Sequence, residues 1–170
     1  RGLVGGRNYG YNINDFDGVF IHPRLYKSDC VAIMTEENSK EKLFGQILLD
    51  LADESHPFSP KYLSAFSDLN LAELGKLEQA WSSIPLRRKV TLLEDLEDLM
   101  EADTLISCDA VARFAMQDKD PQVRKQAIHL LWDCEDVSLI PIFMDLLEND
   151  PAETVRAASA AALGKFILLG

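Results

Sequence analysis

The chain has 170 residues, of which 47% are hydrophobic, and a formal net charge of −11 at pH 7. This length and composition are typical of one globular domain, or of one domain with an appendage. The acidic balance argues against nucleic-acid binding, because contacts with phosphates require clustered Lys and Arg side chains.

Membrane insertion and a disulfide framework are also disfavoured. No apolar run approaches the length of a membrane span. Cys30, Cys108 and Cys134 are odd in number and far apart, and their spacing does not suit a zinc site. A reducing, cytoplasmic location is therefore the simpler prediction.

Residues 1–33 differ from the rest of the chain. Five of the nine glycines lie between Gly2 and Gly18, and helical periodicity is absent. The Asn and Asp residues before Gly18 invite a calcium-loop interpretation, but the spacing places Ile13 where the first carboxylate belongs. We predict an irregular extension without a metal site. Because Met34 has the character of a native amino terminus, our hypothesis is that this extension is not native.

Residues 34–69 are predicted to contain two short helices. The first runs from Ser39 to about Glu54, and the second begins at Pro60, after the break at HPFSP. Their apolar residues are Leu43, Phe44, Ile47, Leu48 and Leu51, then Tyr62, Leu63 and Phe66. These helices carry no repeat signature, and we expect them to cap the units that follow.

Residues 70–100 are predicted to form a helix pair. Asn70 and Glu73 have the spacing of a capping box, and the apolar residues after them follow helical periodicity to Trp81. After the break at SSIP, a second helix is predicted from Leu86 to Met100.

Acidic residues share one face of that second helix. They are Glu94, Glu97, Asp98 and Glu101. Basic residues stand at its start, so the charge order opposes the helix dipole. The acidic stripe has two interpretations, a docking surface for a basic partner or a solvated face with ion pairs.

The stretch from Asp109 to Lys165 contains one pattern written twice. The first copy reads DAVARFAMQDKDPQVRKQAIHLLWD, and the second, thirty-two residues on, reads PIFMDLLENDPAETVRAASAAALGK. In each copy a short apolar helix precedes Asp-Pro, a strong helix start, and then Val-Arg within a second helix. Arg124 thereby aligns with Arg156 and, more loosely, with Arg87. A helix-turn-helix period of this length is typical of α-solenoids.

The two Asp-Pro turns and the A-A-A-L-G-K ending at Ala160 to Lys165 resemble the HEAT-repeat family and the short HEAT-like repeats of bilin lyase subunits. The resemblance implies an all-α superhelix of about three helical hairpins within residues 70–170. Their expected bounds are 70–100, 104–134 and 138–168, behind the N-terminal cap at 34–69. It also implies structural roles at the repeat turns for Asp120, Pro121, Arg124, Asp150, Pro151 and Arg156.

We expect a non-catalytic scaffold that binds a protein or peptide and uses no cofactor. His22, His56 and His129 lie on separate segments, without the spacing of a nucleophile and base. Besides the acidic stripe, the candidate partner-binding residues are Lys125, His129, Trp132 and Asp133. Trp132 stands where the next copy has Gly164, so its ring either fills a groove between units or serves as a binding anchor.

The resemblance leaves two other functions open. One is a subunit of a bilin lyase-like enzyme, and the other is a HEAT-like enzyme acting on nucleic acid, which the acidic charge opposes. The apolar residues 166–169 have no polar cap after them. We therefore expect either that this is the N-terminal fragment of a longer repeat protein or that it self-associates through this end.

Overall fold

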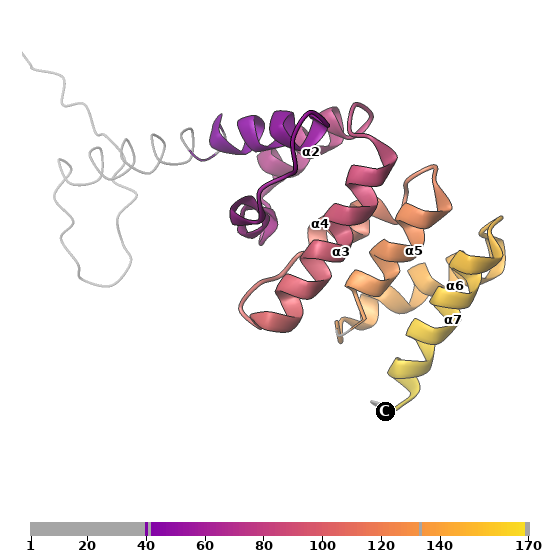
Figure 1. Cartoon of the computed structure of the whole chain (residues 1–170). Helices are drawn as coiled ribbons and strands as arrows, with labels where there is room; N and C mark the ends of the chain where they lie inside the picture. Colours follow the sequence, from indigo (N-terminus) through magenta and orange to yellow (C-terminus); the bar gives the residue numbers. More distant parts are fainter. Residues whose placement is uncertain (1–39, 41, 133, 169–170) are drawn as a thin grey trace, which may run out of the picture. The chain divides into compact units, whose positions relative to one another are not determined.

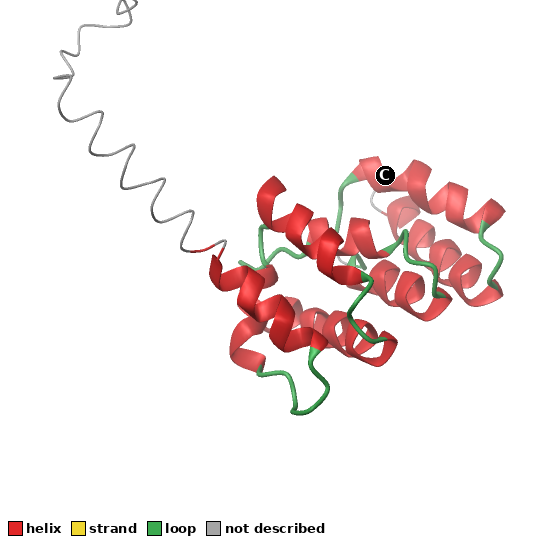
Figure 2. Cartoon of the chain, turned by 90° about the horizontal axis from the view of Figure 1, so that it is seen from above, coloured by secondary structure: helices red, strands yellow, loops and turns green. Residues whose placement is uncertain are grey.

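The computed structural model describes residues 40, 42–132 and 134–168, all within the second of the two units into which the chain divides, Ser39–Gly170. Every regular element among these residues is a helix, which confirms the predicted all-α class (Figure 2). The elements are a helix over residues 42–52, η1 (Pro60–Phe66), α2 (Leu71–Trp81), α3 (Leu86–Ala102), α4 (Asp109–Ala115), α5 (Pro121–Leu130), η2 (Val137–Leu139), α6 (Ile140–Asn149) and α7 (Glu153–Leu168). The predictions for residues 1–33 and for Asp133 lie outside the described residues.

Short polar side chains fix where the helices begin. Oδ1 of Asn70 accepts hydrogen bonds of 2.9 Å from the amides of Ala72 and Glu73. The Glu73 carboxylate accepts one of 3.0 Å from the Asn70 amide, which confirms the predicted capping box. Asp120 caps α5 in a similar way, because its Oδ1 accepts from the amide of Gln122 at 2.8 Å.

The start of α7 differs from the prediction. This helix begins at Glu153, and Asp150 instead ends α6, with its Oδ1 accepting from the amide of Ala152 at 2.8 Å. The structural counterpart of Asp150 is Asp118, whose Oδ1 accepts from the amide of Asp120 at 2.7 Å. The prediction that Asp150 and Pro151 start this helix is wrong, because the Asp-Pro pair lies two residues further from Val-Arg in the second copy.

The helices stack as hairpins. α4 packs against α5 and α6 packs against α7, while α3, α5 and α7 lie side by side in sequence order (Figure 1). At the other end of the stack, α2 packs on α4 and η1 packs on α3. This arrangement is the predicted α-α superhelix, in which each unit shelters the apolar side of the next.

One contiguous core holds the stack together, from Phe44 to Ala162. At its amino-terminal end, the rings of Phe44 and Phe66 meet edge to face with centroids 5.3 Å apart, which joins the helix over residues 42–52 to η1. Further along, Leu93 and Phe143 are fully buried. Each such side chain contributes about 1.5–3 kcal/mol, so the stack is a firm support for the side chains on its surface.

Candidate functional site

The acidic residues of α3 lie on the surface beside α5. Glu94, Asp98 and Glu101 are exposed, whereas Glu97 is half-buried. Oε2 of Glu97 accepts a 2.5 Å hydrogen bond from Nε2 of Gln126, which ties this carboxylate to α5. The acidic stripe therefore lies along the junction of two units rather than on an isolated helix.

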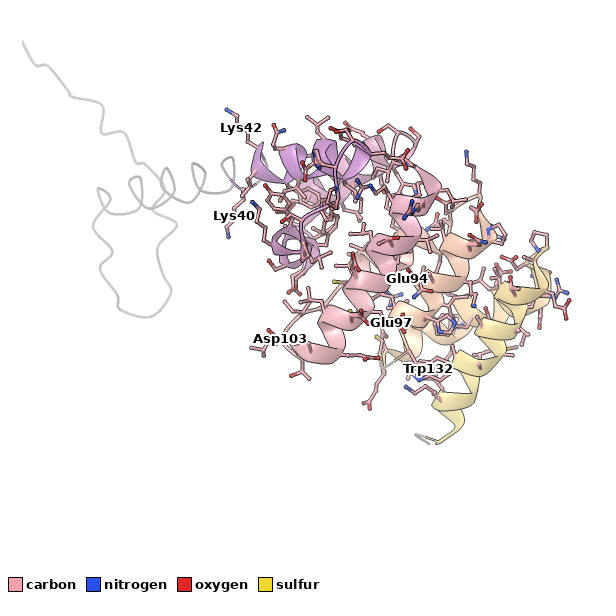
Figure 3. All side chains as sticks on the ribbon, viewed as in Figure 1. Lys40, Lys42, Glu94, Glu97, Asp103 and Trp132 are labelled. Carbon is pink, nitrogen blue, oxygen red and sulfur yellow. The ribbon has the colours of Figure 1, made fainter. Side chains whose placement is uncertain are left out.

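A pocket of about 80 Å³ opens in the same region. It is lined from α3 by Glu97, Met100 and Glu101, and from the end of α5 and beyond by His129, Leu130 and Trp132 (Figure 3 labels Glu97 and Trp132). The two sets of partner-binding candidates came from different helices in the sequence, and four of their members line this one pocket.

Trp132 is held in place although its side chain is accessible. Its ring stacks on that of His129, with centroids 6.2 Å apart and planes inclined by 16°. Nζ of Lys165, on α7, lies 4.9 Å from the Trp132 ring centroid and donates a 2.6 Å hydrogen bond to the Trp132 carbonyl oxygen. The residue is nonetheless 37% exposed, so a partner that contacts it meets a preorganised aromatic surface.

The other partner-binding candidates that the structure describes lie outside the pocket. Lys125 is exposed on α5, and Glu94 and Asp98 are exposed on α3 without lining the pocket. They therefore belong to the surroundings of the pocket rather than to its walls.

The predicted turn residues take part in a buried ion pair between units. Nε and Nη2 of Arg124 each donate a 2.8 Å hydrogen bond to the Asp150 carboxylate. Nη1 donates to the carbonyl oxygens of Asp118 and Lys119, at 2.8 and 3.0 Å. The bonds from Arg124 hold the pKa of Asp150 below its usual range, and Asp150 in turn raises the pKa of Arg124. This contact joins α5 to the α6–α7 turn.

An equivalent contact occurs one unit earlier, between residues that sequence reasoning missed. Nζ of Lys89, on α3, donates a 2.8 Å hydrogen bond to Oδ2 of Asp118, and Nε1 of Trp81 donates to the same oxygen at 2.6 Å. Burial alone raises the pKa of Asp118, but the bonds from Lys89, the Asp120 amide and Trp81 outweigh it and bring the pKa below its ordinary value.

A sequence signal for this second contact does exist. Lys89 and Arg124 are each the fourth residue of their helix, and Asp118 precedes Asp150 by the repeat period of thirty-two residues. The predicted alignment of Arg87 with Arg124 is therefore wrong by two positions. We call the contacts Lys89–Asp118 and Arg124–Asp150 the inter-unit ladder.

The other turn residues have local roles. Asp120 caps α5, and Pro121 is the first residue of that helix. Pro151 is exposed, and its carbonyl oxygen accepts a 3.1 Å hydrogen bond from Nη1 of Arg156. The same Nη1 donates to the carbonyl oxygen of Asp150 at 2.9 Å. These contacts fix the path of the chain between α6 and α7.

The described side chains offer little for covalent or metal chemistry. Burial raises the pKa of the Cys108 thiol to about 12 and also raises that of Cys134, so neither is an activated nucleophile. Within residues 42–132 and 134–168, no group of three or more His, Cys, Asp or Glu side chains could hold a metal ion. None of the helices that the structure describes has both the length and the apolar character needed to cross a membrane.

Stacked helical hairpins joined by a recurring ion pair define an α-solenoid. Comparison with protein families gives its type for part of the chain: residues 108–167 match the family described as HEAT repeats. The predicted resemblance to HEAT repeats is thereby confirmed for α4 to α7. Neither the curated proteins nor the solved structures yield a match.

Proposed function

We propose that this protein is a non-catalytic scaffold that binds a basic segment of a partner protein on the surface formed by α3 and the end of α5. The observation that carries the proposal is the pocket that Glu97 and Glu101 line together with the exposed Trp132. HEAT repeats usually mediate protein–protein interaction, which agrees with this role. The bilin-lyase alternative rests on the sequence resemblance alone, and we do not propose it.

Charge and aromatic surface act together at this site. An exposed ion pair contributes roughly 0.2–1 kcal/mol, so four acids give selectivity for basic partners more than they give affinity. Trp is enriched among the residues that dominate binding energy, and its truncation costs about 2 kcal/mol or more where it is buried on binding. We therefore expect Trp132 to supply affinity and the acids to select the partner.

The test is capture of partners from the cells that make the protein, quantified for three forms of the full chain. The site variant carries Glu94→Gln, Glu97→Gln, Asp98→Asn and Glu101→Gln. The control variant carries Glu78→Gln, Asp145→Asn, Glu148→Gln and Glu153→Gln, at exposed acids on α2, α6 and α7. Both variants lose four negative charges, so they differ only in where on the surface those charges are removed.

The proposal predicts a partner that the wild type and the control variant retain and the site variant loses. At about 0.5 kcal/mol per acid, the loss is roughly 2 kcal/mol, or about thirtyfold in affinity. The captured protein should present a Lys- or Arg-rich segment, and that segment as a peptide should change the fluorescence of Trp132. If the site and control variants capture the same proteins in equal amounts, the proposal is wrong.

A further inference from the structure

We propose that a pocket at the junction of α2, α3 and α4 binds a small neutral molecule that combines an aromatic ring with a carbonyl group. The volume of this Trp81 pocket is about 280 Å³, compared with about 80 Å³ for the pocket beside Trp132. Ligand pockets have volumes of roughly 300–1,000 Å³, so this one has room for a small ring compound. The two pockets share no lining residue, and the inference therefore does not depend on the proposed function.

Two aromatic rings form the apolar wall of the Trp81 pocket. Trp81, at the end of α2, is 6% exposed, and Phe114, on α4, is half-buried. The rings meet edge to face, with centroids 5.2 Å apart and planes inclined by 76°, and both line the cavity. An aromatic ligand buries apolar surface against such a wall and makes ring–ring contacts with it.

The polar group at the base of the pocket is the ammonium of Lys89. This residue lines the cavity although it is only 5% exposed, and its Nζ lies 4.8 Å from the ring centroid of Trp81. One of the ammonium N–H groups donates a 2.8 Å hydrogen bond to Oδ2 of Asp118. No other acceptor among the described residues is bonded to Nζ, which has further N–H groups to donate. A ligand carbonyl oxygen can therefore accept a charge-assisted hydrogen bond from Lys89.

The charges around the pocket select a neutral ligand. Lys89 is already paired with Asp118, whose Oδ2 also accepts a 2.6 Å hydrogen bond from Nε1 of Trp81. A ligand carboxylate brings a second negative charge beside Asp118, and a ligand cation brings a second positive charge beside Lys89, and each is costly at a buried site. The exposed rim is balanced as well, with Glu78 on α2 and Lys119 after α4. A carbonyl group meets the available donor without adding charge.

Three compounds of nearly the same size and shape separate these requirements. Benzamide has the ring and a neutral carbonyl, benzoate has the ring and a negative charge, and benzamidine has the ring and a positive charge without a carbonyl. Each is titrated into the isotope-labelled full chain while the indole Nε1–H resonances are followed by NMR. The chain has two Trp residues, so Trp132 is an internal control, and Trp132→Phe assigns the two resonances.

Benzamide should shift the Trp81 resonance saturably, at roughly millimolar concentration, and leave the Trp132 resonance unchanged. Benzamidine should bind about tenfold more weakly or worse, because it cannot accept the hydrogen bond from Lys89. Benzoate should be weaker than benzamide by a similar factor, because its charge lies beside Asp118.

A double variant tests whether the ammonium is responsible. Lys89→Met with Asp118→Asn removes both buried charges together, and the new amide oxygen can still accept from Nε1 of Trp81. The control, Lys125→Met with Asp145→Asn, makes the same exchanges at exposed residues outside the pocket. The affinity for benzamide should fall about tenfold or more in the double variant and stay unchanged in the control.

The ligand series uses the wild-type chain, so it decides the question even where the double variant does not fold. The absence of a saturable shift at Trp81, equal binding of the three compounds, or full affinity for benzamide in a folded double variant overturns the proposal. A shift confined to the Trp132 resonance also overturns it, because benzamide then occupies the other pocket.

Discussion

Removing the guanidinium of Arg124 should be among the most damaging single changes in the fold. Arg124→Ala deletes two hydrogen bonds to Asp150 and two to backbone carbonyl oxygens. It leaves the carboxylate of Asp150, a residue only 8% exposed, with the Ala152 amide as its one remaining hydrogen-bond donor among the described residues. Breaking a buried ion pair from one side costs about 3–5 kcal/mol. Since a domain of this size is stable by roughly 5–15 kcal/mol, the variant should lose between about a fifth and nearly all of its stability.

Urea unfolding followed by circular dichroism measures this effect. With a slope of about 2 kcal/mol/M, a loss of 4 kcal/mol lowers the unfolding midpoint by about 2 M. Lys125→Ala, at the exposed neighbouring residue, is the matched control and should stay within about 0.5 kcal/mol of the wild type. The unfolding midpoint of Arg124→Lys should lie between those of Arg124→Ala and Lys125→Ala, because Lys89 shows that one ammonium can hold a turn aspartate. Equal midpoints for Arg124→Ala and Lys125→Ala would refute the reasoning.

Three further predictions concern buried polar groups. Because the folded pKa of Asp118 is lowered, its ion pair contributes stability above the unfolded pKa of about 3.9, and this is lost as the pH falls through the folded pKa. Asp118→Asn should cost about 3 kcal/mol at pH 7 in urea titrations, and the difference from the wild type should shrink below about pH 4. The buried hydroxyl of Ser159 has no hydrogen-bond partner among the described residues, so Ser159→Ala should raise the melting temperature by about 3 °C in calorimetry. With a pKa of about 12 and 1% exposure, Cys108 should resist thiol labelling at pH 8 in the folded protein and react in urea, as peptide mass spectrometry would show.

The sequence was most informative where local chemistry and periodicity agreed. Asn70 and Glu73 form the predicted capping box, because both partners lie within one helix turn and no distant contact competes with them. The buried face of α5 likewise follows from helical spacing, with Val123 and Ala127 fully buried. Such features depend on neighbours along the chain, so sequence reasoning can reach them.

Contacts between units were harder to predict. Asp-Pro marks the start of α5 but not of α7, since two extra residues separate it from Val-Arg in the second copy. Comparing the two Asp-Pro dipeptides pairs Asp150 with Asp120, whereas the structural counterpart of Asp150 is Asp118. Lys89 was counted as a charge opposing the dipole of α3, although its ammonium is buried against Asp118. Arg88, at the same basic start of α3, also has a structural role, because it donates hydrogen bonds to the carbonyl oxygens of Asp53 and His56.

The candidate site shows how an α-solenoid converts sequence repeats into a surface. Because α3, α5 and α7 lie side by side, equivalent positions of successive second helices become neighbours although some thirty residues separate them in sequence. Glu97 on α3, Trp132 after α5 and Lys165 on α7 come together for this reason. A residue that departs from the repeat pattern therefore changes the surface at one place without changing the stack. Trp132, where the next copy has Gly164, is such a departure, and partner recognition should depend on it while folding depends on the inter-unit ladder.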